Sequence, residues 1–563
     1  MLDFPRVSAE AFVRFLEQHP SLLPEVTGHR DKVRLFPIRL PEFPDGRQFQ
    51  SAWLVLPSDF PNNDSASIRL SRDAVLRVPH VEYNGNLCLE GDPGPNSGHT
   101  AEDRVNVLLR RFYLKFLDPW LTGELEGDFS QEALNYWTIL VNRSASSRNA
   151  VSRIYTVDSR HPAPRVYRAR LLLPSRLVVA GDNPALADRF VTSLGNRAAQ
   201  ICNVVVADIP IAHALTPLTW PRTESALERL VAGRLGESLA NKFRRQGRPR
   251  GKAIHRIVLL RAPHCSFGFL LTGGPPTVAG RSIIKRAYPT TRMLPLFVDR
   301  IDPLWTCGRE QHPEIACRQR RHVLVLGAGA LGSPVIDQLA KAGVGRISVV
   351  DPDTLSTANI GRHLLGAEAI GHRKADLLVK RVALSNPAVL LTPYYESAQT
   401  WIAKRTLAEI DVILDLTGEP DVRWCLEHAR QVHPRPLLIG WMEPYVAAAH
   451  ACILPTNERW MRTAGDPLES LQAVDWPKEV IQREPACSSD FQSYTSAAAV
   501  HAVALISEAA LALIDGLVAQ PVVRSWIRGK RFLDGHYPGL EHRAWAKDAT
   551  PYDGISLERA WHE

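Results

Sequence analysis

The chain has 563 residues, more than the roughly 100–200 residues of a typical domain, so we expect several domains. A net charge of +8, with 45% hydrophobic and 22% charged residues, excludes wholesale disorder and falls short of a nucleic-acid-binding signature. The 8 cysteines include no C-x-x-C pair, which excludes a disulfide scaffold and disfavours the common four-cysteine zinc site.

The two ends of the chain give no targeting or membrane signal. The N-terminus lacks a positively charged leader before an apolar run, so secretion is not expected. The longest apolar stretch, 496–519, is interrupted by His501, Glu508 and Asp515. We therefore expect a cytoplasmic protein without a membrane span.

The first segment, 1–145, is predicted to be an α+β domain. Ser8 is a suitable N-cap for an amphipathic helix, and an irregular stretch that contains Cys88 separates the strands from later helices. The predicted strands are 32–40, 51–57 and 67–70, and the predicted helices after the loop are 101–117 and 130–141.

The middle segment, 146–305, is predicted to be an α/β linker domain with no catalytic constellation. Apolar strand patterns alternate with helical patterns in it. The strands are expected at 176–180, 201–207 and 254–261, and the helices at 184–194 and 223–244.

The third segment, 306–563, opens with a βαβ pattern. A short apolar strand, 322–326, leads into the glycine-rich turn Gly327, Gly329 and Gly332. A helix over 333–343 and a strand over 346–350 follow, and the strand ends at Asp351. The predicted fold class of the whole chain is therefore α/β and multidomain, with a Rossmann-like C-terminal domain.

The glycine-rich turn predicts a nucleotide site. Such a turn lets backbone N–H groups approach a phosphate, and the helix that follows adds a favourable dipole. An acid about twenty residues later, here Asp351, can hold a ribose hydroxyl. On these features alone, a dinucleotide-dependent dehydrogenase remains as good an interpretation as any other.

The residues that follow distinguish the alternatives. The pattern from Asp351 and Asp353 through Asn359 and Arg362 to Lys374 resembles that of the ThiF/MoeB/ubiquitin-activating superfamily. The resemblance implies activation of a carboxylate with ATP and Mg²⁺. By this resemblance, Asp351 and Asp353 bind the ribose and the metal. Asn359, Arg362 and Lys374 lie against the phosphates, where the two cations neutralise charge.

Two positions depart from the family pattern. His363 stands where the family has glutamine, and Gly418 replaces an acid that usually binds Mg²⁺. Asp415, at the end of the preceding strand, is our predicted metal ligand, with Glu419 and Asp421 as alternatives. A strand-end acid held by backbone amides is an equally good interpretation of Asp415.

Cys487 lies just before a long apolar helix, 496–517, where a helix dipole favours a thiolate. Its surroundings resemble those of the thioester-forming cysteine in the cysteine-using members of the superfamily. The alternative is a small buried hydrophobe, and Cys425 and Cys452 fit that alternative well.

The stretch from Pro79 to Cys88, together with a strand followed by Phe60-Pro61, resembles the active-site region of ubiquitin-conjugating enzymes. The resemblance implies that Cys88 is an acyl-transfer nucleophile on a rigid shallow loop, which an amine can approach from solvent. Gly85 would permit the tight backbone path that presents this thiol.

The family's oxyanion-stabilising asparagine has no counterpart in this sequence. An amide or imidazole donor would be chemically suitable, and Asn84, Asn86 and His99 are the candidates. For His80 we expect a structural role in the loop.

The chain as a whole resembles a bacterial fusion of a ubiquitin-conjugating-like domain with a ThiF/ubiquitin-activating-like domain, of the CD-NTase-associated type in antiphage (CBASS) operons. The resemblance implies adenylation of a ubiquitin-like protein or of a CD-NTase C-terminus, a thioester relay, conjugation to a target lysine, and a homodimer. Nucleic acid is not an expected partner, because the basic stretches 243–252 and 318–321 lack aromatic platforms. The alternatives are a ThiF-type adenylyltransferase for sulfur transfer, and a ubiquitin-like-protein binding module with a degenerate nucleotide site.

Overall fold

The computed structural model describes residues 34–38, 52–89, 91–144, 153–158, 161–174, 177–195, 198–246, 254–273, 292–461, 465–480, 482–483, 490–491, 493–547 and 554–561. The chain forms two compact units. The first comprises residues 1–155, 160–182 and 197–299, and the second comprises 156–159, 183–196 and 300–563. The helix predicted after Ser8 lies outside the described residues, and the domain boundaries expected at 145 and 305 stay predictions.

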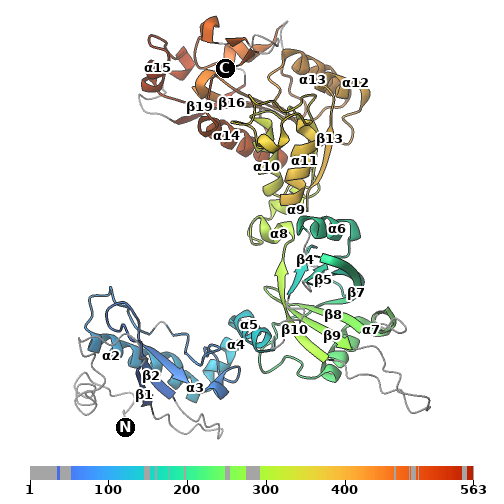
Figure 1. Ribbon diagram of the computed structural model, residues 1–563. Helices are drawn as coiled ribbons and strands as arrows, with labels where there is room; N and C mark the ends of the chain where they lie inside the picture. The colour runs from blue at the N-terminus through green and yellow to red at the C-terminus, as the bar shows by residue number, and fades with distance from the viewer. Residues whose placement is uncertain are drawn as a thin grey trace. The chain divides into compact units, whose positions relative to one another are not determined.

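The N-terminal part of the first unit is a small antiparallel sheet followed by helices (Figure 1), and its predicted elements are confirmed where the structure describes them. The sheet order is β1-β2-β3. The elements are β1 (Arg34–Ile38), β2 (Ala52–Leu56), β3 (Ser67–Leu70), α2 (Ala101–Phe112) with a π-helical turn after it, α3 (Asp118–Leu121), α4 (Asp128–Gln131) and α5 (Ala133–Ser144).

The rest of the first unit is a closed β-barrel, which the α/β prediction for the middle segment did not anticipate. Its strand order is β10-β4-β6-β5-β7-β8-β9. The strands are β4 (Arg153–Thr156), β5 (Arg165–Pro174), β6 (Leu177–Ala180), β7 (Ala198–Pro210), β8 (Ile254–Arg261), β9 (Ser266–Gly273) and β10 (Arg292–Arg300). The predicted strands and helices exist, but β4, β5, β9 and β10 were missed. Those strands close the barrel, and apart from the parallel pair β7–β8 the described pairings are antiparallel.

Two helices accompany the barrel strands in the sequence. The helix α7 (Glu224–Gln246) packs along β7 and β5 and is kinked at Gly236, where φ is +71°. The helix α6 (Pro184–Ser193) belongs to the second unit instead. It packs against α11 (Lys374–Ser385), and Arg189 Nε donates a hydrogen bond of 2.9 Å to the Pro387 carbonyl.

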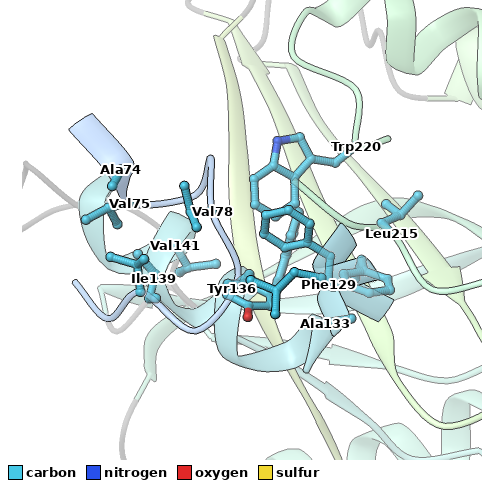
Figure 2. Packing of buried hydrophobic residues seen from close by; sticks show 14 of the residues in the cluster. Ala74, Val75, Val78, Phe129, Ala133, Tyr136, Ile139, Val141, Leu215 and Trp220 are labelled. Carbon is cyan, nitrogen blue, oxygen red and sulfur yellow. The ribbon is translucent and has the colours of Figure 1, made fainter. Parts of the chain in front are cut away.

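The helix α5 joins the barrel to the N-terminal sheet and helices through one apolar core. Trp137 is buried, donates from Nε1 to the Leu296 carbonyl at 2.8 Å, and makes edge contacts with Phe267 and Phe269. Figure 2 shows Tyr136 on the same helix within this core, which Trp220 also enters. Aromatic edge contacts and large buried areas make such a cluster a main source of stability.

The second unit is built on a mostly parallel sheet in the order β13-β12-β11-β14-β15-β16-β19-β20. The strands from β13 to β15 are parallel and the rest are antiparallel. They are β11 (His322–Leu326), β12 (Arg346–Val350), β13 (Leu390–Tyr394), β14 (Val412–Asp415), β15 (Leu437–Met442), β16 (Ala448–Leu454), β19 (Val522–Ile527) and β20 (Ile555–Ala560).

Helices cover both faces of this sheet (Figure 1). The helices α10 (Gly332–Lys341), α11 and α14 (Ser496–Ile514) pack on one face, and α12 (Ala398–Lys404) and α13 (Pro420–Val432) pack on the other. The shorter elements are α8 (Pro303–Thr306), α9 (Glu314–Arg318), β17 (Gln482–Arg483), β18 (Asp490–Phe491) and α15 (Lys530–His536).

By length and composition alone, α14 is apolar enough to cross a membrane. It instead buries Ala502, Ile506 and Ala510 in the core beneath the sheet and contacts β14, β15, β16 and β19. This is the packing of a core helix in a doubly wound unit.

Candidate active sites

The first candidate site lies where the strand order of the second unit reverses. The chain leaves β11 toward β12 and β13 on one side and returns to β14 and β15 on the other. In open parallel sheets, ligands bind in the crevice outside the carboxyl ends of the strands at such a point. The glycine-rich turn follows β11 directly, and Asp415 ends the neighbouring β14.

The three glycines of the turn meet different constraints. Gly327 has φ of +88°, and a Cβ there would lie 2.8 Å from the Leu416 carbonyl oxygen. A Cβ on Gly332 would lie 2.0 Å from the Gly327 oxygen, so the turn and the start of α10 need both residues. A Cβ on Gly329 would meet no atom within 4 Å. Packing does not require a glycine there, whereas a closely approaching phosphate would.

The helix α10 presents its N-terminus beside this turn. Its N-cap residue, Leu331, provides no side-chain hydrogen bond to the first-turn amides. A helix N-terminus with uncapped N–H groups favours an anion. The turn and the helix together therefore form a cradle suited to phosphate.

Asp351 is buried and fixes the turn. Its Oδ2 accepts a hydrogen bond from the Ala328 N–H at 2.7 Å, and its Oδ1 accepts one from the Asp353 N–H at 2.9 Å. Burial raises the pKa of Asp351 above its ordinary value, although both N–H groups and Lys374 act in the opposite direction. Each oxygen keeps a second lone pair for a ligand hydroxyl.

Lys374 is a buried cation at the start of α11. Its Nζ lies 2.8 Å from Asp353 Oδ2, and its side chain is 8% exposed while that of Asp353 is 62% exposed. Arg362 is half-buried, with its guanidinium 5.4 Å from the ring centre of Tyr494. Asn359 accepts hydrogen bonds from the N–H and hydroxyl of Ser356 at 3.0 Å, so it shapes the loop that carries Arg362.

His363, which replaces the family's glutamine, holds the glycine-rich turn from the opposite side to Asp351. Its Nδ1 accepts a hydrogen bond from the Leu365 N–H at 3.0 Å, so the proton of the neutral ring lies on Nε2. Nε2 therefore donates to the Ala328 carbonyl at 2.6 Å. Burial lowers the pKa of His363, which favours this neutral tautomer.

We expect His363→Gln to keep ATP affinity near the native value at pH 7.5, because a glutamine amide can also donate to the Ala328 carbonyl. We expect His363→Ala to raise the KM for ATP about tenfold, the cost of about one charge-neutral hydrogen bond and a looser turn. Since the depressed pKa means that protonation requires a pH below about 6.5, only the native protein should lose ATP affinity as the pH falls below that value. Equal pH profiles for the native protein and His363→Gln would contradict this role.

Asp415 is 1% exposed, and its Oδ1 accepts hydrogen bonds from the Thr417 N–H at 3.1 Å and from the Thr417 hydroxyl at 2.6 Å. Its Oδ2 has no hydrogen-bond partner, and burial raises the pKa of this carboxyl. An orphaned carboxylate oxygen beside a phosphate cradle suits a hard cation. Within the described ranges, no group of three or more His, Cys, Asp or Glu side chains could hold a metal by itself. Mg²⁺ would then take its other ligands from phosphate oxygens and water, as it commonly does.

The predicted nucleophile Cys487 lies outside the described residues. The chain is described again shortly after it, where Tyr494 packs over Arg362 and Thr495 caps α14 through its hydroxyl. Tyr494, seven residues after Cys487 in the sequence, therefore lies beside the predicted phosphate-binding arginine. Cys452 is buried in β16 and Cys425 is partly buried in α13, as their apolar surroundings predicted.

The second candidate site is the exposed thiol of Cys88 in the first unit. The loop before it is fastened to β3, because Leu70 N–H donates to the Gly85 carbonyl at 2.8 Å and Leu87 N–H donates to the Ile68 carbonyl at 2.7 Å. Gly85 has φ of +91°, and a Cβ there would lie 2.4 Å from the Leu70 oxygen. The thiol therefore stands on a backbone that the sheet edge holds in place.

His80 holds the same loop through a backbone hydrogen bond to Cys88. Its carbonyl accepts the Cys88 N–H at 2.7 Å, and its ring lies 2.9 Å from Asp128 and 3.5 Å from Glu132. The φ of His80 is +61°, and its N–H donates to the buried Tyr136 hydroxyl. These contacts engage His80 in holding the loop, the role that we expected for it.

Three residues were candidates for stabilising an oxyanion near Cys88. Asn84 accepts the Asn86 N–H at 2.9 Å, and Asn86 Oδ1 accepts from Arg69 Nε at 2.8 Å. The side-chain oxygens of both asparagines accept these bonds, so their side-chain NH₂ groups are the donors that could meet an oxyanion. His99 is exposed. The assignment stays a prediction.

A buried ion pair fastens the chain on the other side of Cys88. Asp92 binds Arg104 of α2 through both carboxylate oxygens, at 2.7 and 2.8 Å, and both side chains are 1% exposed. Asp92 also accepts the N–H groups of Ala66 and Gly94. Burial by itself would raise the pKa of Asp92, but these hydrogen bonds and the Arg104 charge lower it.

We expect Asp92→Asn to lower the free energy of unfolding of the first unit by about 3–5 kcal/mol at pH 7, because it leaves the Arg104 charge buried and uncompensated. Because the pKa of Asp92 is lower in the folded than in the unfolded protein, ionised Asp92 contributes its full stabilisation at pH values above its unfolded pKa, about 3.9. This stabilisation is lost as the pH falls through the pKa of Asp92 in the folded protein. The difference between native protein and variant should therefore shrink below about pH 3.9. Urea unfolding at pH 7 and pH 3 tests this, with the exposed Asp118→Asn as control. A pH-independent difference would refute it.

Several of these features carry no clear signal in the sequence. The bonds of His363 and Thr417 depend on loop geometry, and Tyr494 is far from Arg362 along the chain. The pairing of Asp92 with Arg104 was also missed, although an acid and an arginine flanking a predicted helix start could have suggested it.

The ThiF family model matches residues 316–458 of this chain. The ATP-dependent ubiquitin transferase-like protein Cap2 of Pseudomonas aeruginosa is 26% identical over 297 residues, 49% of this chain and 51% of that protein. Cap2 of Enterobacter hormaechei is 29% identical over 40% of this chain and 42% of its own length.

The sulfur carrier protein adenylyltransferase of Thermus thermophilus is 33% identical over 22% of this chain and 45% of its own length. The chain thus spans about half the length of these curated relatives. The glycine-rich turn, Asp351, Arg362 and Lys374 all lie within the residues that match the ThiF family model. The chain is thus α/β and multidomain, and its residues 316–458 are similar to the ThiF family.

Proposed function

We propose that this chain activates the C-terminal carboxylate of a protein with ATP and passes the acyl group through two thiols to an amine. The observation that carries the proposal is the convergence of the glycine-rich turn, Asp351 and Lys374 within residues 316–458, which match the ThiF family model. The similarity to ubiquitin transferase-like proteins over half the chain supports a conjugation pathway over adenylation alone.

In the first step, an oxygen of the substrate carboxylate attacks the α-phosphorus of ATP, and pyrophosphate leaves. The Gly329 backbone and the N-terminal amides of α10 bind phosphate oxygens, while Lys374 and Arg362 neutralise the charge that builds up on the leaving group. Asp351 holds the ribose and the turn. A magnesium ion held by Asp415 would supply further charge neutralisation on the phosphates.

In the relay, the Cys487 thiolate attacks the acyl carbon of the adenylate and AMP leaves. The Cys88 thiolate then attacks that thioester, and the Cys487 thiolate leaves. A lysine amine of the target protein finally attacks the acyl carbon, loses a proton and expels the Cys88 thiolate. Thiolates suit both stations because they attack well and leave well.

We also propose a substrate, a pathway and an assembly state for this activity. The activated protein is a ubiquitin-like protein or the C-terminus of a CD-NTase, and the pathway is antiphage defence. The chain acts as a cytoplasmic homodimer. The expected signature is a set of adducts formed with ATP and the activated protein, which thiol reductant removes.

The test is non-reducing electrophoresis and mass spectrometry of the full chain with ATP and the candidate protein. The proposal predicts adducts at Cys487 and Cys88, the loss of all reducible adducts in the double variant with alanine at both positions, and accumulation at Cys487 in Cys88→Ala. Adducts that survive in the double variant would overturn it.

A second candidate function is adenylation for sulfur transfer, which the similarity to the Thermus sulfur carrier protein adenylyltransferase favours. That chemistry needs the nucleotide site alone, so it predicts that Cys88→Ala keeps full activity toward the carrier. A binding module with a degenerate nucleotide site, suggested by Gly418, predicts that Arg362→Ala and Lys374→Ala leave function unchanged.

A further inference from the structure

A cavity of about 460 Å³ lies within the first unit, and Cys88 is not among the residues that line it. It is lined by the segment of Val75, by the C-terminal end of α5, by the chain that precedes α7, and by β9 and β10. Figure 2 labels Val75 and Trp220, two of the residues that line it. Its volume lies within the range of small-molecule sites, roughly 300–1,000 Å³.

Three arginines are among the residues that line this cavity: Arg77, Arg143 and Arg222. All three side chains belong to exposed residues, and no carboxylate of the described residues forms an ion pair with any of them. Arg222 instead donates to the Pro217 carbonyl at 3.2 Å, which fixes its position. No acidic residue occurs among the described residues that line the cavity. The cavity therefore carries a concentrated positive charge without an internal counter-ion.

The remaining wall is apolar. Trp220 and Phe269 contribute aromatic surface, and Leu140 and Met293 contribute aliphatic surface. Trp220 is 8% exposed and is held by an edge contact with Trp137, 5.8 Å between ring centres. A rigid apolar wall beside a cluster of cations suits a ligand with an apolar body and an anionic head.

The backbone at the cavity adds an independent observation. Leu76, another lining residue, has φ of +67°. A bulky residue in this left-handed region costs on the order of 1–3 kcal/mol, and such strain clusters at ligand clamps and functional sites. The strained residue lies directly between Val75 on the apolar wall and Arg77 among the cations.

We propose that this cavity binds a small organic phosphate, with the phosphate on the three arginines and an aromatic or aliphatic body against Trp220 and Leu140. A carboxylate carries one charge and is satisfied by a single bidentate guanidinium, whereas three guanidinium groups match the charge and the several oxygens of a phosphate. The site is separate from the glycine-rich turn and its chemistry is independent of the acyl relay.

The experiment is isothermal titration of the full chain with phenyl phosphate, a phosphate on an aromatic body. We expect saturable binding of phenyl phosphate. Inorganic phosphate, phenol and benzoate should each bind at least about tenfold more weakly, because each lacks either the dianionic phosphate group or the aromatic ring. Arg143→Met and Arg222→Met should each weaken binding about tenfold. The matched control, Arg110→Met, changes an exposed arginine of α2 and should have no effect.

Two further variants separate this cavity from other sites. Leu140→Trp fills the cavity while keeping every arginine, so it should abolish binding, and unchanged thermal unfolding would show that the unit stays folded. Lys374→Met alters the glycine-rich site and should leave phenyl phosphate binding intact. The proposal is overturned by a lack of saturable binding at millimolar ligand, by benzoate binding equal to that of phenyl phosphate, or by full binding in Leu140→Trp.

Discussion

Replacing Lys374 by methionine is expected to lower the rate of ATP–pyrophosphate exchange by about 10²–10³-fold, the usual cost of removing one preorganised group that stabilises charge in a transition state. The Lys374 ammonium is 8% exposed and lies 2.8 Å from Asp353 Oδ2. Its charge also opposes the rise in the pKa of nearby Asp351 that burial causes, so it compensates the acids at this crevice. Without it, the acids face the triphosphate with no buried cation between them.

A control variant on the same helix, α11, tests whether the buried position of Lys374 causes this loss. Lys380 is an exposed lysine of α11, so Lys380→Met should leave exchange unchanged. Lys374→Arg keeps the charge but changes its shape, and we expect it to recover part of the rate. Exchange within threefold of the native rate in Lys374→Met would exclude a role for this ammonium in the chemistry.

Replacing Cys88 by serine is expected to stop conjugation to target amines while exchange continues at the native rate. The two outcomes separate because Cys88 follows a loop held to β3 in the first unit, whereas the proposed adenylation site is the crevice of the second. A serine hydroxyl can accept the acyl group but releases it slowly, because an alkoxide leaves less well than a thiolate. The variant should therefore accumulate an ester that reductant does not cleave.

The control for this variant is the other exposed cysteine among the described residues. Cys317 lies in α9, and Cys317→Ser should conjugate as the native protein does. Conjugation that persists in Cys88→Ser, measured by the formation of reductant-resistant products on the target lysine, would remove Cys88 from the relay.

The crevice of the second unit could be predicted from the sequence because its determinants are local. Gly327 and Gly332 are required by their own backbone, and Asp351 follows the next strand of the same βαβ unit. The geometry of His363 could not be predicted, because its partner Ala328 lies on a segment that only the fold brings to it. The contacts of Asp415 are local: the Thr417 N–H that it accepts fits the strand-end interpretation, whereas the partnerless Oδ2 was not foreseen. Cys88 was found through its motif, but the hydrogen bonds that hold its loop to β3 were not.

The barrel contains strands that the sequence patterns did not predict. Its predicted strands, 201–207 and 254–261, lie within β7 and β8. The strands β5 and β9 that pair with them contain arginine and glycine among their apolar residues, which weakens the pattern. Closure depends on pairings such as β5–β7 and β9–β10, and no local signal specifies them. The arginine-lined cavity likewise exists only because five segments meet: the Val75 segment, α5, the chain before α7, β9 and β10.

The most direct test of the adenylation chemistry is ATP–pyrophosphate exchange by the full chain with two forms of one protein tail. One form ends in a free carboxylate and the other is capped as a C-terminal amide, which cannot attack phosphorus. The proposed chemistry predicts exchange with the free carboxylate, none with the amide, and loss of the signal in Lys374→Met. Equal exchange with both tails, or no exchange with the tail of any ubiquitin-like protein or nucleotidyltransferase, would contradict it.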